Sequence, residues 1–503
     1  MIIENFRLRH HLPLWLAGVL IVPALLIHLG RMPLTSDEPT RALVSLEMLL
    51  SGNYITPTIA GEFYYNKPPL YNWILAMFIH YSDGIPEFAV RMPAVLSLLG
   101  FAASVFLFTR RYWGKTEGIL AALMLVTCGR ILFWDSMLGL IDLLYSWVTF
   151  ASFAIIINNL LKNNFLRLFV GSWILAAVGF MLKGIPSFLF QGISLFVLML
   201  YARQWKRLFS WHHLTGIATF ILLVGTYAML YSRENSFSQY VQVLWDQSAQ
   251  RASSGKGPMG YISHLLLFHP RMLYHFLPWS LLPVALFLPA IRKPMLKHFT
   301  KSTSDPNNDS SQNDPRDRVA SMLLLLFIAN ISVYWLSPAT IPRYILMLAP
   351  PAFVAGLHGV TKYAGIKAST RFRGIAGWMI TGLLAARILV NVLWIPPRAE
   401  MLAENRQKKD ALEMAAITGN RPVRVVGSSW IDHVTLVYLT RAKGEIIRRE
   451  KASFESGVYY LADQQRYNSL LKTSAEKPDI IKTTLIRHQQ ETAYLIMFKP
   501  SPP

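Results

Sequence analysis

The sequence has little charge and almost no cysteine for its length. Of its 503 residues 15% are charged and 53% are hydrophobic, whereas roughly 25% of residues are charged in ordinary soluble proteins. The one cysteine, Cys128, lies in an apolar run, which excludes an intrachain disulfide and a cysteine-based zinc site. Acidic residues are scarce, since 49 Lys and Arg face 28 Asp and Glu for a net charge of +21. A basic excess suggests nucleic acid in a soluble chain, but this apolar fraction argues against a nucleic-acid partner.

Long apolar runs predict an α-helical polytopic membrane protein that has the lipid bilayer as a partner. A spanning helix needs about 20 mostly apolar residues, and by that measure the chain holds about eleven candidates. They lie near residues 12–30, 87–109, 117–134, 138–158, 166–182, 185–201, 213–231, 272–290, 319–337, 342–361 and 374–395.

The Lys and Arg residues between these runs fall in alternate loops, as cytoplasmic loops require. The start of the chain is therefore expected in the cytoplasm, and the odd number of spans puts the end of the chain outside. The first span has basic residues before it but no small-x-small cleavage site before Arg31, so we expect a retained anchor.

Two domains are expected. Residues 1–395 form a transmembrane domain with outer loops at about 31–86 and 232–271, and residues 301–318 read as a polar cytoplasmic linker. Residues 396–503 have shorter apolar runs and predict a small extracytoplasmic α/β domain. Its expected helix spans about 399–417, and its expected strands include Val423–Val426, Ile446–Ile447, Val458–Leu461 and Tyr494–Phe498.

The first outer loop concentrates polar residues beside the membrane, where they are costly unless used or hydrated. It begins with Asp37-Glu38 and later carries Lys67-Pro68-Pro69. Two amphipathic stretches, 38–51 and 69–81, predict helices that lie on the membrane surface. Helix N-capping is an alternative use of the acidic pair, and Lys67 read alone is an interfacial lysine.

The order of these motifs, ending at Arg91-Met92-Pro93, resembles the GT-C glycosyltransferases that use polyprenyl-phosphate sugars. The likeness is nearest to the lipid A aminoarabinose transferases and the protein O-mannosyltransferase-like family. It covers residues 10–200 well, and the topology to about 395 more loosely. The resemblance implies that Asp37 is the catalytic carboxylate with Glu38 beside it, that Glu47-Met48 keeps the family's spacing, and that Lys67 binds the donor phosphate.

Several further positions are implied by the same resemblance. Asp142 matches a second acidic position, and Asp135 competes with it, although an acid there is also a natural partner for Arg130. Lys183 matches a Lys-Gly-Pro turn at an outer helix end. Further donor-phosphate ligands are Arg251 in the second loop and Arg343 with Tyr344 before a late span, where interfacial anchoring is the alternative.

The sequence also departs from the family's pattern. The arginine expected three residues after Asp37 is Thr40, and Arg41 follows it as a supporting cation. Asn66 stands where the aminoarabinose transferases have a metal-binding Glu, and Ser248 aligns with their metal-binding His. We therefore expect no metal site of that kind and no other cofactor, with His264 or His269 as alternative ligands for a divalent metal.

The expected function is transfer of a sugar from a polyprenyl-phosphate donor to a lipid, polysaccharide or protein acceptor, with inversion, at the outer face of a bacterial inner membrane. A hexose and a pentose both remain open. Alternatives are a lipid flippase, a non-catalytic polysaccharide-binding membrane protein, and an O-antigen ligase or polymerase. A flippase predicts charges near the bilayer midplane, whereas the interiors of these spans carry almost none.

Overall fold

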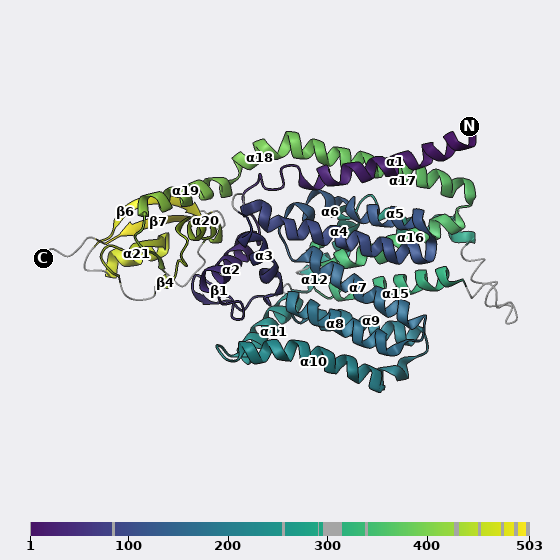
Figure 1. Cartoon of the computed structure of the whole chain (residues 1–503), viewed down its shortest axis with the longest axis horizontal. Coiled ribbons are helices and arrows are strands. Elements are labelled where there is room, and N and C mark those ends of the chain that lie inside the picture. Colours follow the sequence, from purple (N-terminus) through teal and green to yellow (C-terminus); the bar gives the residue numbers. More distant parts are fainter. Residues whose placement is uncertain are drawn as a thin grey trace. The chain divides into compact units, whose positions relative to one another are not determined.

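The computed structural model describes residues 2–82, 86–253, 257–289, 291–294, 314–337, 341–426, 432–450, 454–473, 477–486 and 491–498. Most of the expected linker at 301–318 lies outside these ranges. Figure 1 labels the helices and strands in chain order.

The chain forms two compact units. The first consists of Met1–Ile27, Asn66–Pro68 and Ala94–Val390, and the second of His28–Tyr65, Pro69–Pro93 and Asn391–Pro503. The first outer loop therefore packs mostly with the carboxy-terminal region, while its short 66–68 segment packs with the membrane helices.

Helices dominate the amino-terminal four fifths of the chain. The helices from the start of the chain to residue 231 are α1 (Ile2–Leu26), α2 (Glu38–Ser51), α3 (Leu70–His80), α4 (Pro86–Trp113), α5 (Lys115–Val126), α6 (Gly129–Phe133), η1 (Asp135–Met137), α7 (Asp142–Leu160), α8 (Phe165–Lys183), α9 (Pro186–Tyr201), η2 (Trp205–Phe209) and α10 (Trp211–Tyr231). Those that follow are α11 (Phe237–Ser253), α12 (Pro258–His275), α13 (Leu281–Ala285), α15 (Pro315–Trp335), η3 (Pro342–Leu348), α16 (Ala349–Tyr363), α17 (Ile366–Leu389), η4 (Val390–Trp394), α18 (Ile395–Met401), α19 (Ala403–Thr418), α20 (His433–Lys443) and α21 (Gln464–Thr473).

Within the described ranges, 7 helices are long and apolar enough to cross a membrane, or 8 if the bent pair α5 and α6–η1 is one span. The chain is thus a multi-pass membrane protein, but the expected number of about eleven spans is not confirmed. The runs at 12–30 and 185–201 form shorter apolar helices, Leu12–Leu26 and Pro186–Tyr201.

The run at 272–290 does not form one helix. α12 ends at His275, and only the five-residue α13 follows before Leu286. Pro278 and Pro283 lie in this stretch, and proline lacks the N–H that a helix interior needs. Apolar composition alone therefore overestimated this span.

The helices α7, α8 and α9 carry polar side chains where the start of α7, the end of α8 and the start of α9 meet. α7 and α8 are joined by a short turn at Asn163-Asn164, where the Asn164 side chain accepts a hydrogen bond from Arg167 N–H at 3.2 Å. Because the two helices are antiparallel neighbours, the start of α7 and the end of α8 lie at the same end of the hairpin. Lys162 lies at the opposite end, in a loop predicted to be cytoplasmic.

α10 packs closely on α8 through Gly216. A Cβ atom at Gly216 would lie 2.6 Å from Trp173 Cδ1 and 2.9 Å from the carbonyl oxygen of Phe169. No larger residue fits there without moving backbone, so the glycine sets the approach of these two helices.

The second unit contains α2 and α3, so both amphipathic stretches are helical, while their place on the membrane surface stays a prediction. α2 has Pro39 in its first turn and ends at Gly52, whose φ of 71° and N–H bond to the Met48 carbonyl form a left-handed cap. The short strands β1 (Thr58–Ile59) and β2 (Glu62–Phe63) form a hairpin between the helices. On α3, the Met77 side chain is exposed.

The carboxy-terminal region is a mixed α/β domain, as expected. Its sheet has the order β4-β3-β5-β7-β6, in which β3 pairs in parallel with β4 and β5, and β7 pairs antiparallel with β5 and β6. The strands are β3 (Val423–Val426), β4 (Arg449–Glu450), β5 (Tyr459–Asp463), β6 (Asp479–Ile486) and β7 (Glu491–Met497). The strand expected at Ile446–Ile447 is wrong, because the extended pairing begins later, at Arg449.

Candidate functional site

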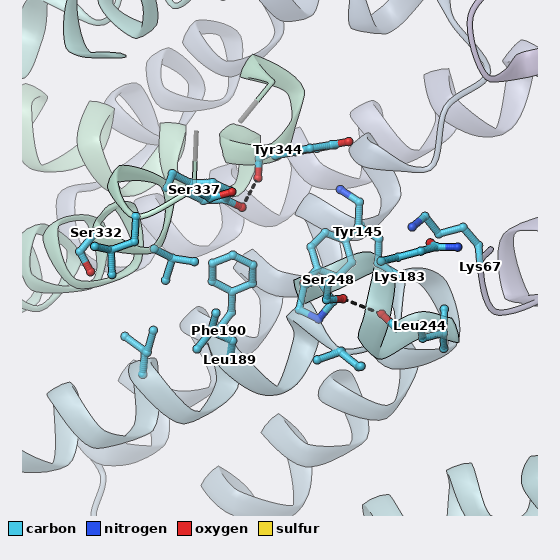
Figure 2. Close-up of a pocket in the computed structure, with 17 residues that line it drawn as sticks. Lys67, Tyr145, Lys183, Leu189, Phe190, Leu244, Ser248, Ser332, Ser337 and Tyr344 are labelled. Atoms are coloured by element: carbon cyan, nitrogen blue, oxygen red, sulfur yellow. Dashed lines mark hydrogen bonds between the residues drawn. The ribbon is translucent and has the colours of Figure 1, made fainter. Parts of the chain in front are cut away.

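A cavity of about 450 Å³ is lined by residues of α7, α8, α9, α11 and α15 in the first unit. Its polar end is lined by Lys67, Lys183, Tyr145 and Tyr344, and Figure 2 shows Leu189 and Phe190 toward the end away from Lys67. Leu189 is 46% exposed and Leu336, which also lines the cavity, is 67% exposed. The cavity is therefore apolar along one side, open at its rim, and cationic at one end.

Lys183 lies at the centre of the polar end because of how α8 terminates. It is the last residue of α8, followed by Gly184 with φ of 77° and then by Pro186 in the first turn of α9. Glycine ends one helix and proline starts the next, so this turn fixes the lysine between the end of α8 and the start of α9.

The Lys183 ammonium contacts a carboxylate and two aromatic rings. Its Nζ lies 2.5 Å from Asp142 Oδ1, 4.8 Å from the ring centre of Tyr145 and 4.7 Å from that of Tyr344. In Figure 2 the side chain extends between these two rings. Cation–π contacts of this kind hold an ammonium without neutralising its charge.

Arg343 also approaches Asp142. Its Nε is 3.6 Å from Asp142 Oδ2, and the Arg343 side chain is only 12% exposed. The backbone next to it is held because the Tyr334 hydroxyl donates to the Tyr344 carbonyl at 2.6 Å. Asp142 thus holds two cations beside the cavity that Lys67 also lines, and the three basic side chains outnumber the one carboxylate.

Asp135 has a different environment. Its two oxygens accept hydrogen bonds from Arg130 Nε at 3.0 Å and Nη2 at 3.2 Å, a bidentate pair. Asp135 is therefore the ion-pair partner of Arg130, as the alternative interpretation had it. Asp142 is the acid that contacts Lys183 and Arg343.

Asn66 of the first predicted loop and the predicted residues of the second loop are placed as follows. Asn66 accepts a hydrogen bond from Gln247 Nε2 at 2.6 Å, and Ser248, which lines the cavity, donates to the Leu244 carbonyl at 2.8 Å (Figure 2). His264 Nε2 lies 3.0 Å from the Tyr334 carbonyl oxygen, and His269 packs against Trp335. Arg251 belongs to α11, but its side chain lies outside the described part of the structure.

Metal binding has no geometric support within the described ranges, where no group of three His, Cys, Asp or Glu side chains lies close enough to hold an ion. Asn66 and Gln247 are joined directly by their amides, which are weaker metal ligands than carboxylate and imidazole. Asn66 and Gln247 therefore do not fit a metal site.

Glu38, in the second unit, is a fully buried member of an ion pair. Its Oε1 and Oε2 accept from Arg91 Nε at 2.8 Å and Nη2 at 2.9 Å, and Oε2 also accepts from Thr35 N–H at 2.9 Å. Arg91 donates three more bonds, all of 2.8 Å, to the carbonyls of Leu29, Met32 and Pro33. All five guanidinium N–H groups are thereby used. Glu38 is suited to hold this turn rather than to exchange protons.

Asp37 lies on that turn and is exposed. It occupies the N-cap position of α2, but its side chain makes no capping hydrogen bond, which is evidence against the capping alternative. The preceding residue, Ser36, has a φ of 59°, a backbone conformation that costs free energy for any residue except glycine. Such strain persists where the surroundings hold the backbone, as the bonds to Arg91 do here.

Arg41 and Glu47 follow on α2. Arg41 is 7% exposed, its guanidinium lies 5.8 Å from the ring centre of Tyr64, and its Nη1 makes no hydrogen bond. Burial raises the pKa of the Glu47 carboxyl, against the opposing effect of hydrogen bonds from Thr58 Oγ1 and the N–H groups of Ala60 and Gly61. Through these hydrogen bonds, Glu47 attaches the β1–β2 hairpin to α2.

Sequence reasoning identified Lys67, Asp142, Lys183, Arg343 and Tyr344, and the structure brings them together or places them around one cavity in the first unit. It missed Tyr145, although Tyr145 lies three residues after Asp142 and so on the same face of α7. It also missed the buried network around Glu38, since its partners come from distant segments.

Comparison with known proteins gives the same resemblance. Residues 66–229 match the family model described as dolichyl-phosphate-mannose-protein mannosyltransferase. An undecaprenyl phosphate-alpha-4-amino-4-deoxy-L-arabinose arabinosyl transferase of Pseudomonas fluorescens is 25% identical over 76% of this chain and 63% of its own length. The corresponding transferase of Edwardsiella ictaluri is 27% identical over 51% of this chain and 46% of its own length. The chain therefore spans about half to two thirds of these relatives.

The fold comparison covers nearly the whole chain. The crystal structure of ArnT from Cupriavidus metallidurans bound to undecaprenyl phosphate aligns with a TM-score of 0.66, covering 96% of this chain and 97% of that one at 15% identity. The expected GT-C fold, with membrane helices and a small carboxy-terminal sheet domain, is thereby confirmed.

Proposed function

We propose that this protein is an integral membrane glycosyltransferase that moves a sugar from a polyprenyl-phosphate donor to an acceptor outside the cytoplasm. The single observation that carries the proposal is the cavity of about 450 Å³ with Lys67 and Lys183 at one end and apolar side chains along the rest. An isoprenoid chain needs an apolar groove, and its phosphate needs cations at one end of that groove.

The exposed rim supports a ligand that is part lipid. Leu189 and Leu336 present exposed apolar side chains on membrane helices, so a chain that enters from the bilayer stays in hydrocarbon surroundings. A wholly polar substrate would gain nothing from this lining.

The charge of the polar end supports a phosphate leaving group. In the reaction the bond between the sugar's anomeric carbon and the phosphate oxygen breaks, and both bonding electrons remain on the polyprenyl phosphate. Lys67, Lys183 and Arg343 stabilise that developing charge through charge-assisted hydrogen bonds, with Tyr145 and Tyr344 keeping Lys183 in place.

The new bond forms between the acceptor's hydroxyl oxygen or amine nitrogen and the anomeric carbon, and the acceptor loses one proton. The resemblance assigns the base for this proton to Asp37, whose exposure and lack of a capping bond suit it to that role. An in-line displacement by the acceptor inverts the anomeric carbon. Arg41 is a supporting cation on the same helix.

The orientation follows from the loop charges. The amino terminus is placed in the cytoplasm and the carboxy-terminal domain outside, in a bacterial inner membrane. Lys183 and Asp142 then lie at the outer ends of α8 and α7, because the basic turn with Lys162 is at the other end of that hairpin. The acceptor is a lipid, a polysaccharide or a protein, and the sugar is a pentose or a hexose.

The proposal is tested with the full chain purified in detergent. Radiolabelled undecaprenyl phosphate should bind, and the Lys67→Met variant should bind it roughly 10- to 100-fold more weakly because one charge-assisted contact is lost. Lys206→Met, which removes an exposed lysine of η2, is the matched control and should bind normally. Equal binding by all three proteins would refute the donor site.

Catalysis is tested separately by Asp37→Asn. Glycolipids and glycoproteins of cells with and without this chain are compared first, because a missing sugar identifies donor and acceptor. The variant should then lose transfer by about 100-fold or more, while Asp246→Asn, at an exposed acid of α11, retains it. Movement of labelled lipid across vesicles in the absence of any acceptor would instead favour a flippase.

A further inference from the structure

The carboxy-terminal domain contacts the loop that carries Asp37 through buried polar side chains of the second unit. Tyr438, on α20, is 3% exposed, and its hydroxyl accepts a hydrogen bond from Leu34 N–H at 3.0 Å. The same hydroxyl donates to Glu87 Oε1 at 2.7 Å. Leu34 lies three residues before Asp37, in the segment whose carbonyls Arg91 holds.

Glu87 joins a second residue of the domain to this contact. It is 1% exposed, and its Oε1 also accepts from Lys408 Nζ of α19 at 2.6 Å. The Lys408 ammonium lies 5.1 Å from the ring centre of Tyr438. Tyr438, Lys408 and Glu87 therefore form one closed cluster, in which two members come from the domain and one from the start of α4.

A third residue of the domain contacts α2 itself. His433 Nδ1 lies 2.7 Å from Thr40 Oγ1, in the first turn of the helix that Asp37 precedes. At the far end of the loop, Arg449 N–H donates to the Ala60 carbonyl at 3.0 Å. The domain thus holds the loop before, just after and well beyond Asp37.

Arg91 and the domain act on different groups of the same segment. Arg91 donates hydrogen bonds to the carbonyls of Leu29, Met32 and Pro33, whereas the Tyr438 hydroxyl accepts one from the N–H of Leu34. With both in place, the strained backbone at Ser36 has fixed segments on each side. Without Tyr438, one backbone N–H in a buried position loses its partner, which costs free energy and favours rearrangement of the turn.

From these contacts we propose that the carboxy-terminal domain is a built-in support of the catalytic loop and that Tyr438 is its positioning residue for Asp37. The proposal gives this domain a function through its contacts with the loop. It rests on the proposed function only in taking Asp37 as the residue that needs positioning.

The test compares Tyr438→Phe with Tyr460→Phe in the full-length chain. Both changes remove only a hydroxyl from a buried tyrosine, but the Tyr460 hydroxyl accepts from Glu455 N–H inside the domain. Tyr438→Phe should lower kcat about 10- to 100-fold, since a small misplacement of a catalytic group has that effect. The donor KM should change less than about twofold, because donor binding is assigned to side chains of the first unit.

Hydrogen exchange of the segment 29–41 gives a readout that does not depend on activity. Tyr438→Phe should raise amide exchange there and leave the strands β5 and β7 protected, whereas Tyr460→Phe should leave 29–41 unchanged. If Tyr438→Phe does not fold, Lys408→Met, at a side chain 31% exposed, is used in its place and should raise exchange in the same segment.

Unchanged exchange at 29–41 together with unchanged kcat in Tyr438→Phe would overturn the proposal. Increased exchange at 29–41 in the control Tyr460→Phe would also overturn it, because the support would then be general to the domain. An active Asp37→Asn enzyme would refute the proposed chemistry instead, while the exchange experiment would still decide whether the domain holds the loop.

Discussion

The two units each contain a buried cluster of opposite charges, and the clusters differ in how completely the charges are satisfied. In the second unit, all five N–H groups of Arg91 are bonded to Glu38 and three carbonyls. In the first, Asp142 faces both Lys183 and Arg343, and Lys67 lines the adjoining cavity. A closed set of bonds fixes a backbone, whereas surplus positive charge beside an apolar cavity is suited to receive an anion.

Burial of charge costs free energy in both clusters, but the two clusters compensate for this cost differently. The Arg91 cluster recovers it within the folded protein through short bonds from every donor. The Lys183 cluster keeps an excess of cations, which aromatic rings and one carboxylate only partly compensate. The contrast predicts that mutations in the two clusters affect different measurements.

The largest effect is expected from Arg91→Met. Loss of the guanidinium leaves Glu38 buried without its partner and frees three carbonyls, which should lower the free energy of unfolding by about 3–5 kcal/mol. Thermal unfolding of the purified chain measures this. Arg373→Met is the matched control, because the Arg373 side chain that pairs with Glu117 is 39% exposed, and its loss should cost less than that of Arg91. Equal destabilisation by the two variants would remove the contrast.

A smaller effect of another kind is expected from Lys183→Met. The affinity for undecaprenyl phosphate should fall roughly 10- to 100-fold, about 1.4–2.8 kcal/mol. Thermal stability should fall less than in Arg91→Met, because Arg343 still faces Asp142. Lys362→Met provides the control, since Lys362 is also paired with an aspartate, Asp317, but lines no part of this cavity. If Lys183→Met lowers stability and leaves lipid binding intact, the cluster is structural like that of Arg91.

The smallest effect concerns pH and the second unit. Burial, with a lesser effect of the Arg449 charge, lowers the pKa of His433 from 6.5 to about 4. The unfolded chain therefore binds a proton at higher pH than the folded protein does. Stability contributed by the neutral imidazole is present above about pH 6.5 and is lost as the pH falls toward 4.

The measurement for His433 is thermal unfolding between pH 7 and pH 4. His433→Asn keeps a polar atom near Thr40 but cannot gain the proton, so its stability should fall less steeply over this window. His264→Asn serves as a control in the first unit, where His264 contacts the Tyr334 carbonyl. Parallel pH profiles for the wild-type protein and His433→Asn would show that this histidine does not titrate on unfolding.

Much of the membrane region was predictable because its signals are local. Apolar length located α4, α7, α8, α10 and the late spans, while Pro39, Gly52, Gly184 and Pro186 marked helix ends. The single helix expected at 272–290 was wrong, because prolines interrupt this apolar run. Apolar composition shows that a segment is compatible with the bilayer, but it does not show whether the backbone forms one continuous helix.

The candidate site was predictable to the extent that motifs preserve it. The resemblance gave Lys67, Asp142, Lys183 and Arg343 their expected roles, but it did not show which acid faced the cations. Geometry separated Asp142 from Asp135, because only the former contacts Lys183. It also separated Glu38, which is buried and paired, from its exposed neighbour Asp37.

The sequence by itself determined that this chain resides in a membrane, which loops are basic, and where its main polar motifs lie. Those properties depend on composition and on near neighbours along the chain. Only the tertiary structure decided that Tyr438 and Lys408 meet Glu87, which is more than 300 residues away from each in sequence (351 and 321). Such contacts depend on how separate elements pack, and no local pattern of residues encodes them.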